Sequence, residues 1–105
     1  MNPVGQTIED VLRAARLKIQ NRDCWCQGGF ARSSSNRIVQ ARSPAAVRWC
    51  LVGAVRAVAA NKNMEIGAIA RLAKFGDPIR TNDISGHTAV LFMLARAIKA
   101  EERRT

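Results

Sequence analysis

The chain has 105 residues, of which 48% are hydrophobic. That share can bury one core without disulfide staples, so we expect a single domain spanning residues 1–105. A total of 17 Lys and Arg residues against 8 Asp and Glu residues gives a formal net charge of +9, which predicts a polyanionic partner, either nucleic acid or an acidic protein. The sequence shows neither a signal segment nor an apolar run of membrane-spanning length, and its three cysteines cannot all pair. These features predict a cytoplasmic protein without membrane contact.

The stretch TIEDVLRAARLKIQNR, residues 7–22, has apolar residues at helical spacing and predicts an amphipathic helix. Thr7 is the expected N-cap, with Asp10 three residues later. The predicted apolar face consists of Ile8, Val11, Leu12, Ala15 and Ile19.

The helical period disappears over residues 21–42, where short apolar runs are separated by the turn-forming cluster RSSSN. This pattern predicts a small β-hairpin or an irregular insert. A second helix is then expected over residues 43–62, with Ser43 as N-cap and Pro44 at the first helical position. Because its only charges up to Ala60 are two arginines, this helix should run through the middle of the fold.

The stretch EIGAIARLAKFG, residues 65–76, predicts a third helix, and residues 77–86 (DPIRTNDISG) predict a loop. A final helix is expected over residues 87–104. The expected fold is therefore mainly α: a four-helix single domain with a small β-hairpin or irregular insert between helices 1 and 2. The predicted buried faces are Ile66, Ile69, Ala70 and Ala73 in the third helix, and Val90, Leu91, Leu94, Ala97 and Ile98 in the last.

Cys24, Cys26, Cys50 and His87 are the soft metal ligands of the chain, and a Cys₃His zinc site is one interpretation. Against it, Cys-x-Cys is not the usual spacing, and a cysteine in an apolar helix ordinarily behaves as a small hydrophobe. A Cys-His nucleophile is a further interpretation, but a histidine after a glycine at a helix start is typically a surface or capping residue. We therefore expect no metal, no cofactor and no catalytic residue.

Polar residues offer two other candidate sites. Gln27, Asn82 and Asp83 could form a polar pocket, although Asn82 or Asp83 could instead close a turn onto backbone N–H groups ahead of the last helix. Three arginines in and beside the insert are the best candidates for phosphate contacts, because the Ser-Asn turn could present them, whereas arginines on helices are usually just solvated. These are Arg32, Arg37 and Arg42.

Three stretches, WCQGGFAR, AVRWCLVGAV and NDISGHTAVLFMLARAI, together resemble a family of small, uncharacterised proteins of bacteria and their phages, a domain of unknown function. The resemblance covers most of the chain, while Cys24 and His87 depart from the pattern. It implies a folding unit and a phage or mobile-element context, and it implies no reaction. The matching residues are Trp25, Gln27, Gly28, Ala31 and Arg32; Ala46 to Cys50, Gly53 and Ala54; and Asn82, Asp83, Thr88, Val90 and Leu94.

The leading functional expectation is a small basic, non-enzymatic binding protein that contacts nucleic acid. A protein-binding inhibitor, such as a phage anti-defence protein acting on a host protein, is the alternative. A small hydrolase that uses Gln27, Asn82 and Asp83 is a second alternative. We expect Trp25 and Trp49 to be core anchors that lie near each other.

Overall fold

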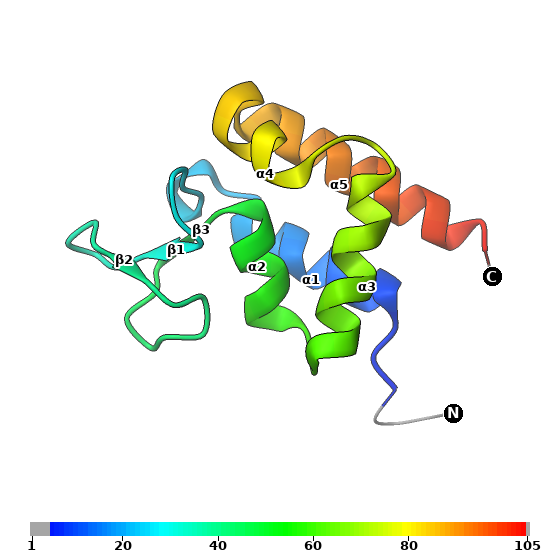
Figure 1. Ribbon diagram of the computed structural model, residues 1–105, viewed down its shortest axis with the longest axis horizontal. Helices are drawn as coiled ribbons and strands as arrows, with labels where there is room; N and C mark the ends of the chain where they lie inside the picture. Colours follow the sequence, from blue (N-terminus) through cyan, green and yellow to red (C-terminus); the bar gives the residue numbers. More distant parts are fainter. Residues whose placement is uncertain (1–4, 105) are drawn as a thin grey trace.

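The computed structural model describes residues 5–104, and over this range the predicted mainly helical fold is confirmed (Figure 1). Four helices are longer than one turn, as predicted, and two shorter helical segments join α3 to the last of them. The segments in chain order are α1 (Ile8–Ile19), the 3₁₀ turn η1 (Arg22–Cys24), α2 (Leu51–Val58), α3 (Lys62–Ala73), α4 (Pro78–Arg80), the π-helical turn η2 (Thr81–Ser85) and α5 (His87–Glu102).

The insert after α1 forms a small antiparallel sheet of three two-residue strands, in the order β2-β1-β3. The strands are β1 (Ala31–Arg32), β2 (Ile38–Val39) and β3 (Arg48–Trp49). The predicted hairpin is therefore present as β1 and β2, and β3 adds a third strand on the other side of β1.

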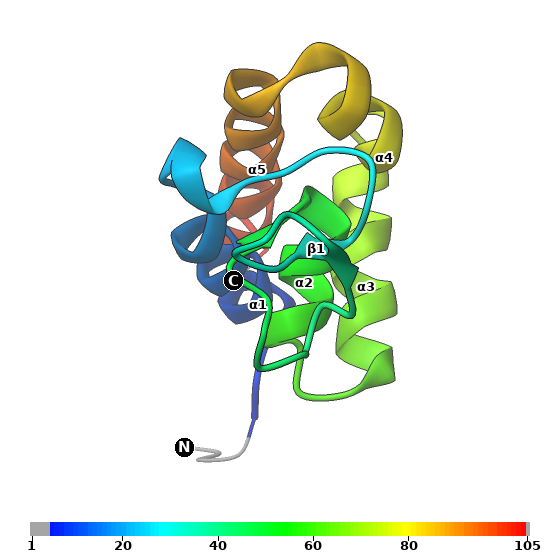
Figure 2. The same cartoon turned by 90° about the vertical axis from the view of Figure 1, so that its left-hand side faces the viewer.

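Helix α1 packs against α2, α3 and α5, and apolar residues of all four helices form one core cluster that also contains Trp25. Figure 2 shows the sheet in front of α2, with α1 and α5 to one side of it and α3 to the other. The β1–β2 hairpin projects away from the helices at one end of the molecule, and the C-terminus of α5 lies at the opposite end (Figure 1). Among residues 5–104, no helix is both long and apolar enough to cross a membrane.

The start of α1 follows the predicted capping pattern. The backbone N–H of Asp10 donates to Thr7 Oγ1 at 3.0 Å, and the backbone N–H of Thr7 donates to Asp10 Oδ2 at 3.0 Å. This reciprocal pair satisfies two N–H groups that the helix itself leaves free. Of the predicted apolar face, Ile8 is partly buried and the other four residues are fully buried.

The expectation that the second helix begins at Pro44 is wrong, because the chain first pairs as strand β3. Trp49 lies opposite Ala31 in the sheet, and α2 begins only at Leu51. Cys50 is its N-cap, and the Cys50 Sγ accepts a hydrogen bond from the backbone N–H of Gly53 at 3.3 Å. Ser43 closes a tight turn, with its carbonyl accepting from Ala46 N at 3.0 Å.

The insert closes onto α2 at Gly53. A Cβ atom at this position would lie 1.8 Å from the carbonyl oxygen of Phe30, so only glycine allows this approach. The same Phe30 carbonyl accepts a hydrogen bond from Cys50 N at 3.1 Å. The contact fixes the loop before β1 against the first turn of α2.

The predicted buried face of α3 is only partly right, because Ile69 packs against the core whereas Ala70 and Ala73 are exposed. Ile66 is 57% exposed, whereas Glu65, Ala68 and Leu72 are buried. Ala68 and Leu72 belong to the apolar core, and Arg56 of α2 binds the Glu65 carboxylate at 3.1 Å, which compensates the charge on that side of α3.

Residues 77–86, expected to be a loop, contain α4 and η2. Asp77 begins this helical path, with its Oδ1 accepting from the backbone N–H of Ile79 at 3.0 Å and of Arg80 at 3.2 Å. The last helix begins at His87 as predicted, and Val90, Leu94, Ala97 and Ile98 of its predicted face are buried, with Leu91 partly so.

Candidate functional site

Asn82 is a buried amide that joins three distant parts of the chain, and only 1% of it is exposed. Its Oδ1 accepts from the indole Nε1 of Trp25 at 2.7 Å and from the backbone N–H of Leu51 at 2.9 Å. Its Nδ2 donates to the carbonyl of Cys26 at 3.0 Å and to Asp83 Oδ1 at 3.0 Å. All four bonding positions of the amide are therefore in use. We call this group the Asn82 joint.

Gln27 and Asp83 lie against the same joint. Gln27 Nε2 donates to the carbonyl of Asn82 at 3.0 Å and to that of Asp83 at 3.2 Å. The backbone N–H of Gly28, a residue with φ of 78°, donates to Asp83 Oδ1 at 3.2 Å. The structure thus brings together the three residues predicted for a polar pocket. The backbone N–H groups that Asn82 and Asp83 bind belong to Leu51 and Gly28 rather than to the turn ahead of the last helix.

A cavity of about 240 Å³ opens between the insert, α2 and α4, and we call it the Phe30 cavity. Gln27 is not part of its lining, and the walls are mainly apolar. Its lining includes Phe30, Cys50, Val52, Ile79, Asn82 and Asp83.

Three arginines gather around an open hollow of about 410 Å³ on another side of the insert. They are Arg22 of η1, Arg32 of β1 and Arg48 of β3, and the hollow has no Asp or Glu among its described lining residues. Asn36 and Trp25 also line it. We call this the basic hollow.

The guanidinium groups of the basic hollow are held by neutral oxygens. Arg32 donates through Nε and Nη2 to the carbonyl of Gln27 at 3.3 and 3.2 Å, and through Nη1 to the carbonyl of Asn36 at 3.0 Å. Arg48 Nη2 donates to the carbonyl of Ser33 at 3.2 Å. Asn36 supports this arrangement with a left-handed backbone, at φ of 67°. Two positive charges are therefore positioned without being neutralised.

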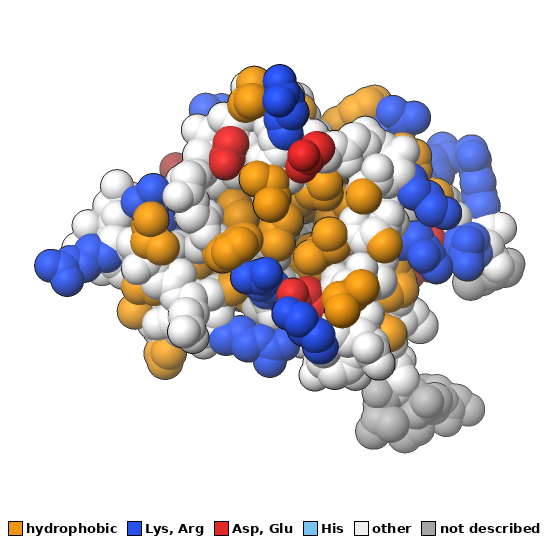
Figure 3. Space-filling view, in the orientation of Figure 1, with side chains coloured by type: hydrophobic (Ala, Val, Ile, Leu, Met, Phe, Trp, Pro, Cys, Tyr) orange, Lys and Arg blue, Asp and Glu red, His pale blue; other side chains and the backbone are white. Residues whose placement is uncertain are grey.

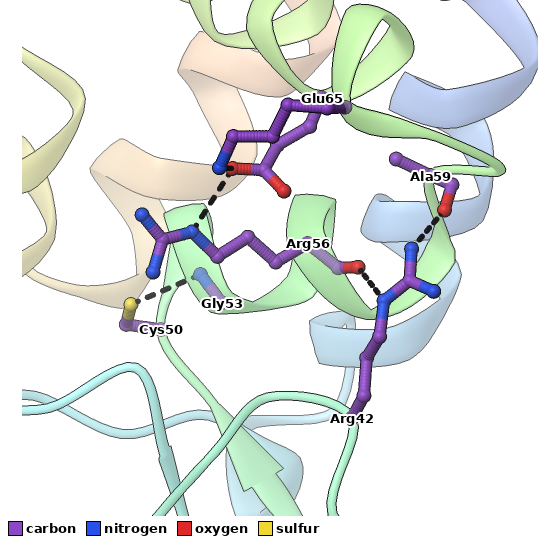
Figure 4. A network of polar contacts seen from close by, with 7 residues as sticks. Arg42, Cys50, Gly53, Arg56, Ala59 and Glu65 are labelled. Atoms are coloured by element: carbon purple, nitrogen blue, oxygen red, sulfur yellow. Dashed lines mark hydrogen bonds and ion pairs between the residues drawn. The ribbon is translucent and has the colours of Figure 1, made fainter.

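The three arginines predicted for phosphate contacts do not form one group. Arg32 lines the basic hollow, and Arg37 is exposed just before β2. Arg42 instead binds the end of α2, where its Nε donates to the carbonyl of Arg56 at 2.9 Å and its Nη2 donates to the carbonyl of Ala59 (Figure 4). It thereby satisfies carbonyls that the helix leaves without partners.

A second basic surface on α5 was missed by the sequence analysis. Arg96, Lys99 and Arg103 line a shallow hollow of about 280 Å³ together with Phe75, and the guanidinium of Arg96 lies 4.9 Å from the Phe75 ring centre. These cations are three and four residues apart, which places them on one face of a helix. The spacing of these three cations in the sequence could have indicated this basic surface.

A family model with the description "Family of unknown function (DUF6197)" matches residues 3–100. The chain belongs to this family. All three stretches that carried the resemblance fall within the match, and the resemblance to a domain of unknown function is confirmed. No curated protein and no solved structure matches the chain.

Two thiols, Cys26 and Cys50, and the histidine of this family member are buried. Burial raises the pKa of the Cys26 thiol to about 11, with nearby Cys50 adding to the shift, and burial also raises the pKa of Cys50. His87 is buried rather than on the surface, as its Nε2 lies 2.7 Å from the carbonyl oxygen of Ile19 and its ring lies 5.2 Å from that of Trp25. Across the described part of the chain, no group of three or more Cys, His, Asp or Glu side chains is placed to hold a metal ion.

Proposed function

We propose that this protein binds nucleic acid and that the basic hollow holds phosphate groups of its backbone. The observation that carries the proposal is the set of three arginines, Arg22, Arg32 and Arg48, around one open hollow without a lining carboxylate. A guanidinium presents several N–H donors in a fixed fork, which suits the oxygens of a phosphate.

The positions of the carboxylates support this choice. Within the described residues, Glu65 pairs with Arg56, Glu101 pairs with Arg71, and Glu9 pairs with Arg13. These ion pairs neutralise cations on the helices. Arg32 and Arg48 of the basic hollow bond to carbonyl and amide oxygens instead, so their charge stays available to an anion.

The form of the hollow also suits a chain of phosphates. Arg22 lies with its guanidinium carbon 5.9 Å from the ring centre of Trp25, and Arg32 and Arg48 are held in place by loop carbonyls. Donors fixed before binding lose less side-chain entropy when a ligand arrives. Exposed Arg37, on the adjoining hairpin, extends the positive surface.

The test is a binding titration with a fluorescently labelled duplex of roughly 20 base pairs and with one of its single strands, at low salt. We compare the wild type with Arg22→Gln/Arg48→Gln. The charge-matched control is Arg96→Gln/Lys99→Gln, which removes the same charge from the α5 surface. Circular dichroism melts check that each variant is folded.

We expect the hollow variant to lose at least about tenfold in affinity and the α5 variant to lose less than about threefold. The hollow variant loses direct contacts with phosphates, whereas the α5 variant loses only part of the general electrostatic attraction. Equal losses would show diffuse attraction without a site. Absence of binding by the wild type at low salt would overturn the proposal.

An acidic host protein, bound by an inhibitor, is the second candidate, and the same arginines favour it because a guanidinium also pairs with carboxylates. Competition separates the two partners. Poly-glutamate that displaces the duplex only at high excess supports nucleic acid, whereas displacement at equal charge concentration supports an acidic protein surface.

A further inference from the structure

The Phe30 cavity is distinct from the basic hollow and has a different chemistry. Figure 3 shows apolar side chains gathered in the middle of the face in view, with charged groups of both signs around them. Phe30, Val52 and Ile79 supply apolar walls, and Ile79 is 54% exposed at the surface. An apolar concavity with few polar groups is the usual form of a small-molecule site.

Asp83 is the one charged residue among the described residues that line the cavity. Its two hydrogen bonds within the described chain, from Gly28 N and from Asn82 Nδ2, both go to Oδ1. Oδ2 is therefore left to accept from a ligand. The other polar side chain of the lining, Asn82, has all its bonding positions in use.

Among residues 5–104, no lysine or arginine forms an ion pair with this carboxylate. Arg56 lies 4.1 Å from the centre of the Phe30 ring, but its charge is compensated by Glu65 at 3.1 Å. Arg32 is bonded to the carbonyls of Gln27 and Asn36 and lines the basic hollow instead. The cavity thus presents one negative charge beside an apolar wall.

We propose that the Phe30 cavity binds a small primary amine with a compact apolar body. The ammonium group pairs with Asp83 Oδ2, and the apolar body lies against Phe30, Val52 and Ile79. The size fits, because a cavity of about 150 Å³ already accepts benzene, and this one measures about 240 Å³. The proposal is independent of nucleic-acid binding.

The experiment titrates ¹⁵N-labelled protein with benzylamine near neutral pH, in parallel with benzyl alcohol and benzoate, which have similar shapes but no positive charge. We expect benzylamine to bind with a dissociation constant on the order of 1 mM, as suits a ligand of this size. The amide signals of Gly28, Val52 and Asp83 should shift. Asp83 is exposed, so benzyl alcohol should bind only about two- to fivefold more weakly, the upper part of the range for an exposed ion pair, and benzoate should not bind.

Two variants test the position of the ligand. Asp83→Asn keeps an oxygen acceptor for Gly28 N and should reduce benzylamine binding to the level of benzyl alcohol. Ile79→Trp fills the cavity from its exposed rim and should abolish the shifts without disturbing the core. The matched control is Asp23→Asn, which removes an exposed carboxylate outside the cavity lining and should leave the affinity unchanged.

Three results would each overturn the proposal. One is equal binding of benzylamine and benzyl alcohol, which would indicate a purely apolar occupant. Another is an unchanged titration of folded Ile79→Trp. The third is a set of shifts that maps to other parts of the surface.

Discussion

Trp25 and Asn82 lie 57 positions apart in the sequence, yet the indole Nε1 of Trp25 donates a 2.7 Å hydrogen bond to Oδ1 of Asn82. The same oxygen accepts from Leu51 N at the start of α2. One buried amide therefore fixes the insert, α2 and the turn before α5 relative to one another. The basic hollow and the Phe30 cavity both adjoin this joint.

Replacing Asn82 by Ala should lower the free energy of unfolding by about 3 kcal/mol or more. The change leaves two N–H donors and the Cys26 carbonyl without partners in the interior, and each unsatisfied group costs about 1–3 kcal/mol. Urea unfolding measures the loss. The control is Asn63→Ala at an exposed position of α3, expected within about 0.5 kcal/mol of wild type. Similar values for both variants would contradict the role of the joint.

Arg42→Ala should reduce stability and leave duplex binding nearly unchanged, since Arg42 caps carbonyls at the end of α2. The expected loss is about 1 kcal/mol, as for a typical hydrogen-bonded cap. Arg37→Ala should have the opposite effects: duplex binding should weaken, and the stability of the fold should not change. Thermal melts measure the stability of both variants, and titrations measure their duplex binding. A binding defect found only in Arg42→Ala would contradict a stability role for Arg42 and a binding role for Arg37.

The salt dependence of duplex binding reports how many phosphates are contacted. Log K should fall linearly with log salt, with a slope of about −0.9 for each phosphate neutralised. If each arginine of the basic hollow meets one phosphate, Arg22→Gln/Arg48→Gln should make the slope shallower by about two. An unchanged slope in that variant would place the phosphates elsewhere on the protein.

Gly53→Ala should destabilise the fold by more than about 3 kcal/mol, because the new methyl group meets the Phe30 carbonyl and backbone must move. Gly67→Ala is the matched control within α3. There the added Cβ meets only the flexible side chain of Ile8, most closely its terminal methyl, and alanine favours the helix, so the two effects nearly cancel. Chemical unfolding of both variants tests the difference, and a stable Gly53→Ala protein would contradict the close approach.

Stability should decrease at alkaline pH through Cys26. Its pKa is about 11 in the folded protein against an ordinary 9.0, so the unfolded chain loses the proton first as pH rises. The stability that the protonated Cys26 thiol contributes is therefore complete below about pH 9 and is lost as the pH rises through about 11. Urea unfolding at about pH 8 and about pH 10.5 measures the decline, which should be smaller for Cys26→Ala. If stability declined equally in both proteins, the decline would come from titratable groups other than Cys26.

The parts of the fold that depend on residues close together in the sequence could be predicted from the sequence. The Thr7 cap and the apolar spacing of α1 are local features, and so is the face of α5. Strand β3 could not be predicted, because the stretch before Cys50 also has a helical apolar pattern and its pairing partner lies in β1. The face of α3 was missed for a similar reason: its apolar residues lie on more than one side of the helix, and packing against the other helices selects the side with Ala68 and Leu72.

The candidate site was predicted only in part. A polar pocket of Gln27, Asn82 and Asp83 was one interpretation of the sequence, and these residues do lie together, but the partners of Asn82 depend on tertiary packing. Of the basic hollow only Arg32 was predicted. Arg22 and Arg48 reach it from η1 and β3, two short segments whose positions no local pattern indicates.

The Asn82 joint also determines the order in which the chain can fold. Its bonds to Trp25, Cys26 and Leu51 span 57, 56 and 31 positions, so during synthesis the ribosome must release residue 82 before any of them forms. Until then the indole N–H of Trp25 and the first N–H of α2 can bond only to water. Contacts so distant in sequence slow folding, because a long loop must close before they are gained. The insert of the nascent chain therefore stays exposed until the last quarter of the protein has been synthesised. During that time it is open to binding by a chaperone or to cleavage by a protease.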